Sequence, residues 1–231
     1  MPLLVLTGLL GAAPSISQTI RPVVVEYRAH RAQGRFELMN EGLTPLNVVL
    51  EPKSFDVTQD GEPLYRPLDP GIHVRLSNMS LTIPPRQSRF VFYEASSDSV
   101  PQWFVITSKL SGFPRRNGLD MCVELPHTVY LVQPHAMSRA DVTVRSCEYR
   151  AGEKILELEL VNLSGNLGRA LETEVVGPRH RERYPSFPLL PHGRRRVRIR
   201  WGGASDPDRV VVRFNGFAVR GWPGETAHIS D

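Results

Sequence analysis

The stretch Glu26-Tyr27-Arg28-Ala29 returns later in the chain as Glu148-Tyr149-Arg150-Ala151. At the same offset, an alternating apolar and polar run that ends in Asn40 returns as a run that ends in Asn162. One alignment therefore serves both matches, and it divides the chain into two similar halves that each open with a pair of strands. Two similar β domains in tandem are more often a binding architecture than a catalytic one.

Short strand-like segments separated by turn residues follow in both halves. The 231 residues include 20 prolines and 18 glycines, which suit many turns and suit long helices poorly. The expected strands of the first half are 21–27, 35–39, 46–51, 55–58, 64–66, 74–81, 89–93, 102–110 and 121–132. Those of the second half are 141–149, 155–162, 170–176, 186–190, 194–201, 210–214 and 217–220, with a loop over 177–184. This pattern predicts an all-β protein with two tandem immunoglobulin-like β-sandwich domains, held at a fixed angle by a short joint.

The beginning of the chain has a different composition from the rest. An apolar run over residues 3–13 is followed by small residues, as in a secretory signal peptide, although the basic start of such a peptide is missing. A buried first strand is the alternative. We expect a signal peptide over 1–18, an N-terminal immunoglobulin-like domain over 19–134 and a C-terminal one over 135–231. No segment approaches the ~20 apolar residues that span a bilayer, so no membrane insertion is expected.

The chain contains two cysteines, Cys122 and Cys147. An exported protein can form a disulfide. However, the strand that Cys122 opens leads away toward the joint for roughly 40 Å at ~3.3 Å per residue. We therefore expect two separate thiols.

Arginines are concentrated in the second half of the chain, which has a formal net charge of +4 overall. The run 194–200 alternates: Arg196, Arg198 and Arg200 face one way, and Val197 and Ile199 face the other. That period is typical of a half-buried strand with a solvated face. An anionic partner surface is the alternative, and nucleic acid is not expected as a partner.

Residue patterns that carry catalysis or bind metals are missing from the sequence. The seven histidines are scattered, and His127 and His135, which flank a strand end, are expected to be solvated. Asp56, Asp60 and Glu62 gather at a hairpin turn, for which a calcium site is the alternative explanation. We predict that the protein is not an enzyme and has no cofactor or metal.

Four segments together carry a family resemblance. They are the first strand 20–25 with the run 36–42, the proline-containing turn 81–91, the long strand 121–132, and the strand–turn–strand 187–195. In this order and spacing the chain resembles the periplasmic pilus-assembly chaperones of Gram-negative bacteria, two-domain immunoglobulin-like proteins, from about residue 16 to about residue 222.

The resemblance implies a mechanism, in which the chaperone lends its last first-domain strand to a pilin subunit that lacks one. Main-chain hydrogen bonds join the two proteins and alternate apolar side chains fill the open groove of the subunit. Here Val123, Leu125, Val129 and Leu131 alternate on one face of that strand. They either line the donated strand or fill this domain's own sandwich. Pro126 favours an edge position, because it cannot donate to a central ladder.

The family also anchors the C-terminal carboxylate of the subunit with an Arg on the first strand and a Lys on the last strand, which form charge-assisted hydrogen bonds. Arg21 stands where the resemblance places the Arg. The last strand contains no Lys, and Lys109 on the neighbouring strand is the nearest substitute.

The resemblance implies a periplasmic chaperone-like protein that binds and stabilises incomplete pilin-like subunits and delivers them to an outer-membrane usher. A tandem structural or adhesion module without a client is the alternative. An enzyme of a class that the sequence does not reveal is the third possibility.

Overall fold

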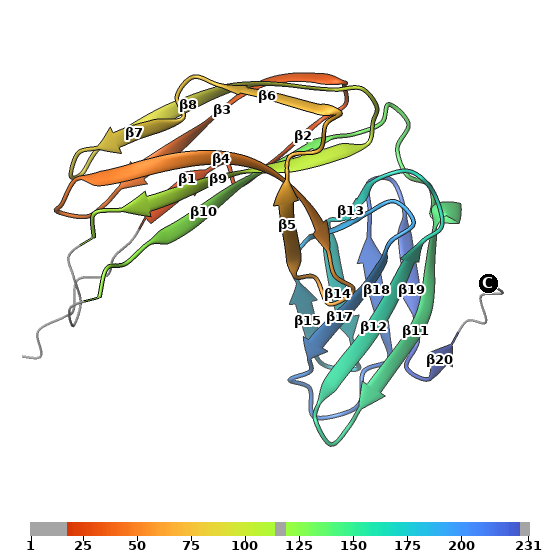
Figure 1. Ribbon diagram of the computed structural model, residues 1–231. Coiled ribbons are helices and arrows are strands. Elements are labelled where there is room, and N and C mark those ends of the chain that lie inside the picture. The colour runs from red at the N-terminus through yellow and green to blue at the C-terminus, as the bar shows by residue number, and fades with distance from the viewer. Residues whose placement is uncertain (1–17, 114–118, 227–231) are drawn as a thin grey trace, which may run out of the picture.

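The computed structural model describes residues 18–113 and 119–226. The predicted signal peptide therefore lies outside the described residues except for its last position. The described chain forms strands, turns and one short 3-10 helix, η1 (Arg139–Asp141). Two groups of sheets meet at an angle, and the hairpin that ends in β5 reaches from the first group toward the second (Figure 1). The predicted all-β fold with two immunoglobulin-like sandwiches in tandem is confirmed.

The first sandwich has two sheets with a shared apolar core. One sheet has the order β1-β3-β8-β6, from β1 (Gln18–Arg21), β3 (Arg31–Asn40), β8 (Ser88–Ser97) and β6 (Ile72–Leu76). The other has the order β2-β10-β9-β4-β5, from β2 (Val24–Tyr27), β10 (Val123–Leu131), β9 (Gln102–Ser111), β4 (Leu46–Val57) and β5 (Pro63–Pro67), and β7 (Ser80–Ile83) also pairs with β4. Alternate residues of facing strands, such as Phe36, Leu38 and Phe104, fill the space between the sheets and are fully buried.

The second sandwich repeats this layered arrangement. Its first sheet has the order β17-β12-β11-β20, from β17 (Arg194–Arg200), β12 (Ile155–Asn162), β11 (Val142–Arg150) and β20 (Glu225–Thr226). Its second has the order β15-β14-β18-β19, from β15 (Arg181–Tyr184), β14 (Glu172–Val176), β18 (Arg209–Arg213) and β19 (Ala218–Gly221). A short pair joins β13 (Gly168–Ala170) and β16 (Phe187–Leu189). The core between the sheets includes Trp201, Leu158 and Val210.

The same asparagine-centred turn occurs in both sandwiches. The amide Nδ2 of Asn40 donates to the carbonyl oxygens of Thr44 at 2.8 Å, Ile83 at 3.0 Å and Pro84 at 3.1 Å. Its Oδ1 accepts the backbone N–H of Gly42 at 3.0 Å. These contacts tie the end of β3 to the turn that joins β7 to β8.

Asn162 makes the equivalent contacts at the end of β12. Its Nδ2 donates to the carbonyl oxygens of Asn166 at 2.7 Å, Leu189 at 3.4 Å and Leu190 at 2.9 Å, and its Oδ1 accepts the N–H of Ser164 at 3.0 Å. Both asparagines are buried. The repeat that the sequence shows is therefore a repeated structural device.

A small apolar cluster joins the two sandwiches. Its buried members are Phe55, Val105, Tyr130, Val132 and Leu167. Next to them Gln133 donates from Nε2 to the carbonyl of Leu167 at 2.9 Å and accepts the N–H of Leu167 at Oε1 at 3.1 Å. The predicted domain boundary, between residues 134 and 135, falls in the segment between β10 and η1.

Several strand boundaries differ from the prediction. The expected strand 21–27 is divided into β1 and β2, which belong to different sheets, because Pro22 has no N–H with which to continue the ladder. Residues 46–51 and 55–58 instead belong to one continuous strand, β4. The expected loop 177–184 contains β15, whose polar side chains hide its strand period. Among the described residues no helix has the length and apolarity needed to cross a membrane.

Candidate partner-binding edge and interdomain cleft

Strand β10 has an open edge over half of its length. On one side it pairs with β9 from Val123 to Leu131. On the other side β2 pairs only with residues 128–131, in parallel. Because the chain leaves for the other sheet at Pro22, no described strand pairs with residues 123–127 on that side.

The direction of the backbone groups on this edge follows from two hydrogen bonds. The N–H groups of Thr128 and Val132 donate to Val23 and Tyr27, at 2.7 and 2.8 Å, on the β2 side. Since N–H direction alternates along a strand, the N–H groups of other even-numbered β10 residues point the same way. The open edge therefore offers the N–H and C=O of Glu124 but only the C=O of Pro126.

The four predicted donor residues divide into two pairs. Val129 and Leu131 are 0% exposed and belong to the core of the first sandwich. Val123 and Leu125 lie beside the open edge and are only partly buried against that core. Val129 and Leu131 thus fill this domain's own sandwich, which is the alternative that the sequence left open, and Val123 and Leu125 are the two that a partner can reach.

The two predicted carboxylate anchors are not brought together. Arg21 is exposed at the end of β1, whose neighbouring Ile20 points into the core. Lys109 lies on the opposite sheet, again with its side chain pointing away from the core, and its Nζ is 2.9 Å from a carboxylate oxygen of Glu51. Their side chains therefore extend from opposite faces of the sandwich, and one carboxylate cannot bind both.

Glu51 balances the charge of Lys109. The ammonium groups of Lys109 and Lys53 hydrogen-bond to the Glu51 carboxylate and lower its pKa. The pKa of Lys109 is raised in turn by the hydrogen bond to Glu51. By contrast, the guanidinium of Arg21 makes no hydrogen bond or ion pair with another residue in the described part of the chain, although its backbone belongs to the ladder between β1 and β3.

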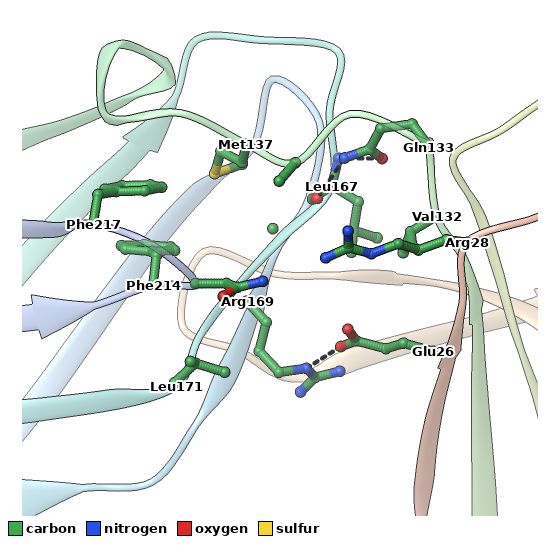
Figure 2. Close-up of a pocket in the computed structure, with 13 residues that line it drawn as sticks. Glu26, Arg28, Val132, Gln133, Met137, Leu167, Arg169, Leu171, Phe214 and Phe217 are labelled. Atoms are coloured by element: carbon green, nitrogen blue, oxygen red, sulfur yellow. Dashed lines mark hydrogen bonds and ion pairs between the residues drawn. The ribbon is translucent and has the colours of Figure 1, made fainter.

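A cleft pocket lies between the two sandwiches (Figure 2). From the first domain, Glu26 and Arg28 point into it at the end of β2, and Arg169 approaches from β13 of the second domain. The Arg169 guanidinium forms an ion pair with the Glu26 carboxylate and lies 5.0 Å from the ring centre of Tyr130. Arg28 is exposed and forms no hydrogen bond or ion pair with the other residues drawn in Figure 2.

These cleft residues were not predicted as a site. They come from β2 and the residue after it, from the segment that follows β10, and from β13 and distant loops of the second domain, and no local pattern connects them. Arg28 belongs to the duplicated tetrapeptide, but that repeat signals the fold and not a function.

The prediction that His127 is solvated is wrong. Its ring is 0% exposed and stacks on Phe36, with ring centres 4.6 Å apart. Nδ1 is 2.7 Å from the Pro22 carbonyl and Nε2 is 3.2 Å from the hydroxyl of Tyr93. Burial lowers the pKa of His127, while the bond to Pro22 opposes this effect. His127 thus ties β10 to the point where the first strand changes sheets.

Two tyrosine hydroxyls extend this buried network. Tyr93 and Tyr27 share a hydrogen bond of 3.0 Å between their hydroxyl groups. Gly34 makes room for both hydroxyl groups. A Cβ at this position would lie 2.3 Å from the Tyr93 hydroxyl and 2.4 Å from the Tyr27 hydroxyl. Burial raises the pKa of Tyr93 above its usual range.

The prediction of two separate thiols is confirmed. Both cysteines are free, Cys122 being exposed and Cys147 buried. Burial raises the pKa of the Cys147 thiol to about 12, which keeps it protonated and unreactive. No group of acidic, histidine or cysteine side chains in the described ranges could hold a metal ion.

Most of the arginine run forms a solvated ionic face, as predicted. Arg196 and Arg198 pair with Glu157, with N–O distances of 3.6 and 2.9 Å. Arg195, between Arg194 and Arg196, is different: it points inward and is 8% exposed. The alternation that points Val197 toward the core also turns the side chain of Arg195 inward.

The described chain consists of two immunoglobulin-like sandwiches in tandem. In the first sandwich, the last strand is unpaired along half of one edge. Solved chaperone structures have this fold. Over 88% of this chain and 97% of its own, the YadV chaperone is 11% identical, with a TM-score of 0.52. For the E. coli chaperone DraB the values are 16% identity, 88% and 94% coverage, and a TM-score of 0.52.

A chain from the complex of Salmonella enterica SafA pilin with the SafB chaperone is 11% identical over 91% of this chain and 98% of that chain, again with a TM-score of 0.52. No model of a protein family matches the sequence, and no curated protein matches it. At these identities the likeness concerns the fold: the chain shares the two-domain fold of fimbrial chaperones.

Proposed function

We propose that the protein is a periplasmic chaperone-like protein that binds incomplete immunoglobulin-like pilus or surface subunits by donating strand β10. The observation that carries the proposal is the open edge of β10 with Val123 and Leu125 half-buried beside it. An unpaired edge of this kind binds an extended partner segment through its backbone, while alternate side chains enter pockets of that partner. The kind of partner that fits such an edge is a β domain that lacks one strand.

The hydrogen bonds that the open edge can form are too weak on their own to hold a subunit. Glu124 can donate and accept one hydrogen bond each and Pro126 can accept one, and each contributes about 0.5–1.5 kcal/mol net. A micromolar complex needs about 8 kcal/mol. Burial of Val123 and Leu125 in the subunit, at about 1.5–3 kcal/mol for a fully buried side chain, therefore has to supply a comparable share.

A carboxylate anchor would supply the remainder. We propose Arg21 for this role, since it is exposed near the open edge and its charge is unpaired among the described residues. Lys109 is the weaker candidate, because Glu51 already neutralises it. Arg28 in the interdomain cleft is a second unpaired guanidinium that a chain terminus could reach, and it is tested alongside Arg21.

Delivery to an outer-membrane usher belongs to the same proposal. The role is binding and transfer, with no catalysis and no cofactor. It is supported by the shared fold with chaperones, one of which was solved together with a pilin. A tandem structural or adhesion module without a client is the rival, and it predicts no specific partner for the β10 edge.

Co-purification tests the proposal. The chain would be co-expressed with a short β-rich subunit encoded beside its own gene, and we expect a one-to-one complex. Leu125→Asp should abolish the complex, since it places a charge in the groove of the subunit. Val49→Asp is the matched control, because Val49 is 54% exposed on β4 with its side chain facing away from the core. If Leu125→Asp unfolds the domain, Val123→Asp, nearer the free end, replaces it.

The anchor is tested separately in the same assay. Arg21→Ala should weaken subunit capture while leaving the thermal unfolding midpoint unchanged, whereas Arg28→Ala should not. The opposite result would move the anchor into the cleft. Equal capture by the wild type and both variants would show that neither guanidinium holds the carboxylate.

A further inference from the structure

The interface between the domains contains a buried arginine that has no counter-ion among the described residues. Arg195, at the start of β17, is 8% exposed. Its Nε and Nη1 atoms are buried and have no hydrogen-bond partner. The guanidinium carbon Cζ of Arg195 lies over the ring of Phe187, 5.4 Å from the ring centre.

The guanidinium reaches from the second domain to the first. Gly61 lies in the turn between β4 and β5. Any larger residue there would clash with the guanidinium, because its Cβ would lie 1.6 Å from Nη1. Arg196, which follows Arg195, is bound to the same turn, because its N–H donates to the carbonyl of Gln59 at 2.7 Å. The β4–β5 hairpin and β17 are thus held together around the charge.

A buried guanidinium cannot lower its cost by losing a proton, because its pKa is too high for that to occur in a protein. Such a charge needs an anion or several hydrogen-bond acceptors. The neighbouring carboxylates are already engaged: Asp56 lies 3.3 Å from Arg66, and Asp60 lies 3.5 Å from Arg196. No described residue forms an ion pair with Arg195.

A cavity of about 270 Å³ lies beside this group. Its walls include Asp56, whose carboxylate is paired with Arg66, and Val57 and Trp103 from the first domain, and Pro188, Arg194 and Arg195 from the second. A water molecule occupies about 30 Å³ in the liquid, so the cavity has room for a small oxyanion with its waters. Arg194, exposed at the same end of β17, brings a second positive charge.

We propose that this interdomain cavity binds a small oxyanion, a phosphate or a carboxylate, on the buried guanidinium of Arg195. The bound anion bridges the β4–β5 hairpin of the first domain and β17 of the second. This site is separate from the open edge of β10 and does not depend on the proposed chaperone function.

Calorimetric titration of the full chain tests the proposal, with sodium phosphate and sodium acetate as separate probes at constant ionic strength. We expect saturable binding of at least one of them, with one site per chain. Phosphate alone would identify a tetrahedral ligand and acetate alone a carboxylate. No saturable binding of either anion to the wild type would overturn the proposal, whatever the variants do.

Arg195→Gln should weaken the binding by about tenfold or more, the loss expected for a charge-assisted hydrogen bond. Arg198→Gln is the matched control, since Arg198 lies on the same strand but is exposed and paired with Glu157, and its affinity should change less than about twofold. Arg195→Lys, which keeps the charge, should retain part of the affinity. Equal affinity in the wild type and Arg195→Gln would place the anion elsewhere and contradict the assignment.

Discussion

At the scale of single residues, Asn40 and Asn162 each share two amide hydrogens among three carbonyl oxygens, and the side-chain oxygen of each accepts a backbone N–H. Both side chains are nearly inaccessible to water. Removing one would leave buried carbonyl groups without a donor, which costs about 1–3 kcal/mol for each unsatisfied group. These side chains therefore hold the turn geometry of both domains.

Asn162→Ala should lower the free energy of unfolding by at least about 3 kcal/mol. Asn47→Ala is the control, because Asn47 is exposed and accepts a single bond from Thr82 at 3.1 Å. Its effect should stay within about 0.5 kcal/mol. Urea unfolding measures both. Equal midpoints for the two variants would show that the buried network contributes little.

His127 should make stability dependent on pH. Burial lowers its pKa in the folded state, and the Tyr93 hydroxyl that contacts it brings no negative charge, because burial raises the pKa of Tyr93. The unfolded chain therefore binds the proton first. The free energy of unfolding should fall as pH decreases below about 6.5, by at most about 1.4 kcal/mol per pH unit, and level off below the folded pKa.

Replacing the histidine should remove this slope. Urea unfolding of His127→Gln between pH 7.5 and pH 5, compared with the wild type, isolates its contribution whatever the absolute stability of the variant. His73→Gln is the control, because its side chain is 65% exposed and the slope should be unchanged. A wild-type slope that persists in His127→Gln would assign the proton uptake to another group.

At the scale of elements, β10 is both an edge strand and a protected one. Open strand edges promote aggregation, and proline is one residue that blocks them. Pro126 is placed where it withholds an N–H from the open side without weakening the ladder to β9. The edge is thus available to a partner but is a poor template for another copy of itself.

Pro126→Val should restore the missing donor and increase self-association of the free protein. Thr128→Val is the matched control, since its side chain also faces away from the core and its N–H is already bound to Val23. Sedimentation velocity over a range of concentrations would measure the effect. A monomeric Pro126→Val variant would show that another feature protects the edge.

Sequence periodicity predicted most strands, because alternating residues such as those of β12 and β17 face one core and one solvated surface. It did not predict that the first strand ends at Pro22 and that residues 24–27 join the other sheet, since local alternation does not show which sheet a strand joins. His127 was misassigned because a polar side chain in an apolar series is solvated unless partners from other strands satisfy it. Those partners, Tyr93 and the Pro22 carbonyl, are distant in sequence. Arg195 was missed as well, because the turn at Gly61 that covers it is distant in sequence.

At the scale of the whole molecule, we expect the shared apolar cluster to couple the unfolding of the two sandwiches. Leu167 is 4% exposed and packs among side chains of the first domain. Its backbone is bound at both polar groups by Gln133. Apolar contact and hydrogen bonds therefore meet at the same residue of the interface.

Leu167→Asp should separate the unfolding of the two domains, because it buries a carboxylate in the apolar cluster. Scanning calorimetry is expected to show one transition for the wild type and two for the variant. Leu163→Asp is the control, since Leu163 is 49% exposed and the single transition should persist. One transition in all three proteins would mean that the cluster does not couple the domains.

The proposed function depends on a partner strand that adds to β10 along residues 123–127. Hydrogen exchange of single amides, measured with and without a bound subunit, tests this most directly. The Glu124 N–H, which points out of the open edge, should exchange quickly in the free protein and slowly in the complex. The Thr128 N–H, already bound to Val23 at 2.7 Å, should be slow in both. A complex in which the Glu124 amide remains fast would show that the subunit binds elsewhere.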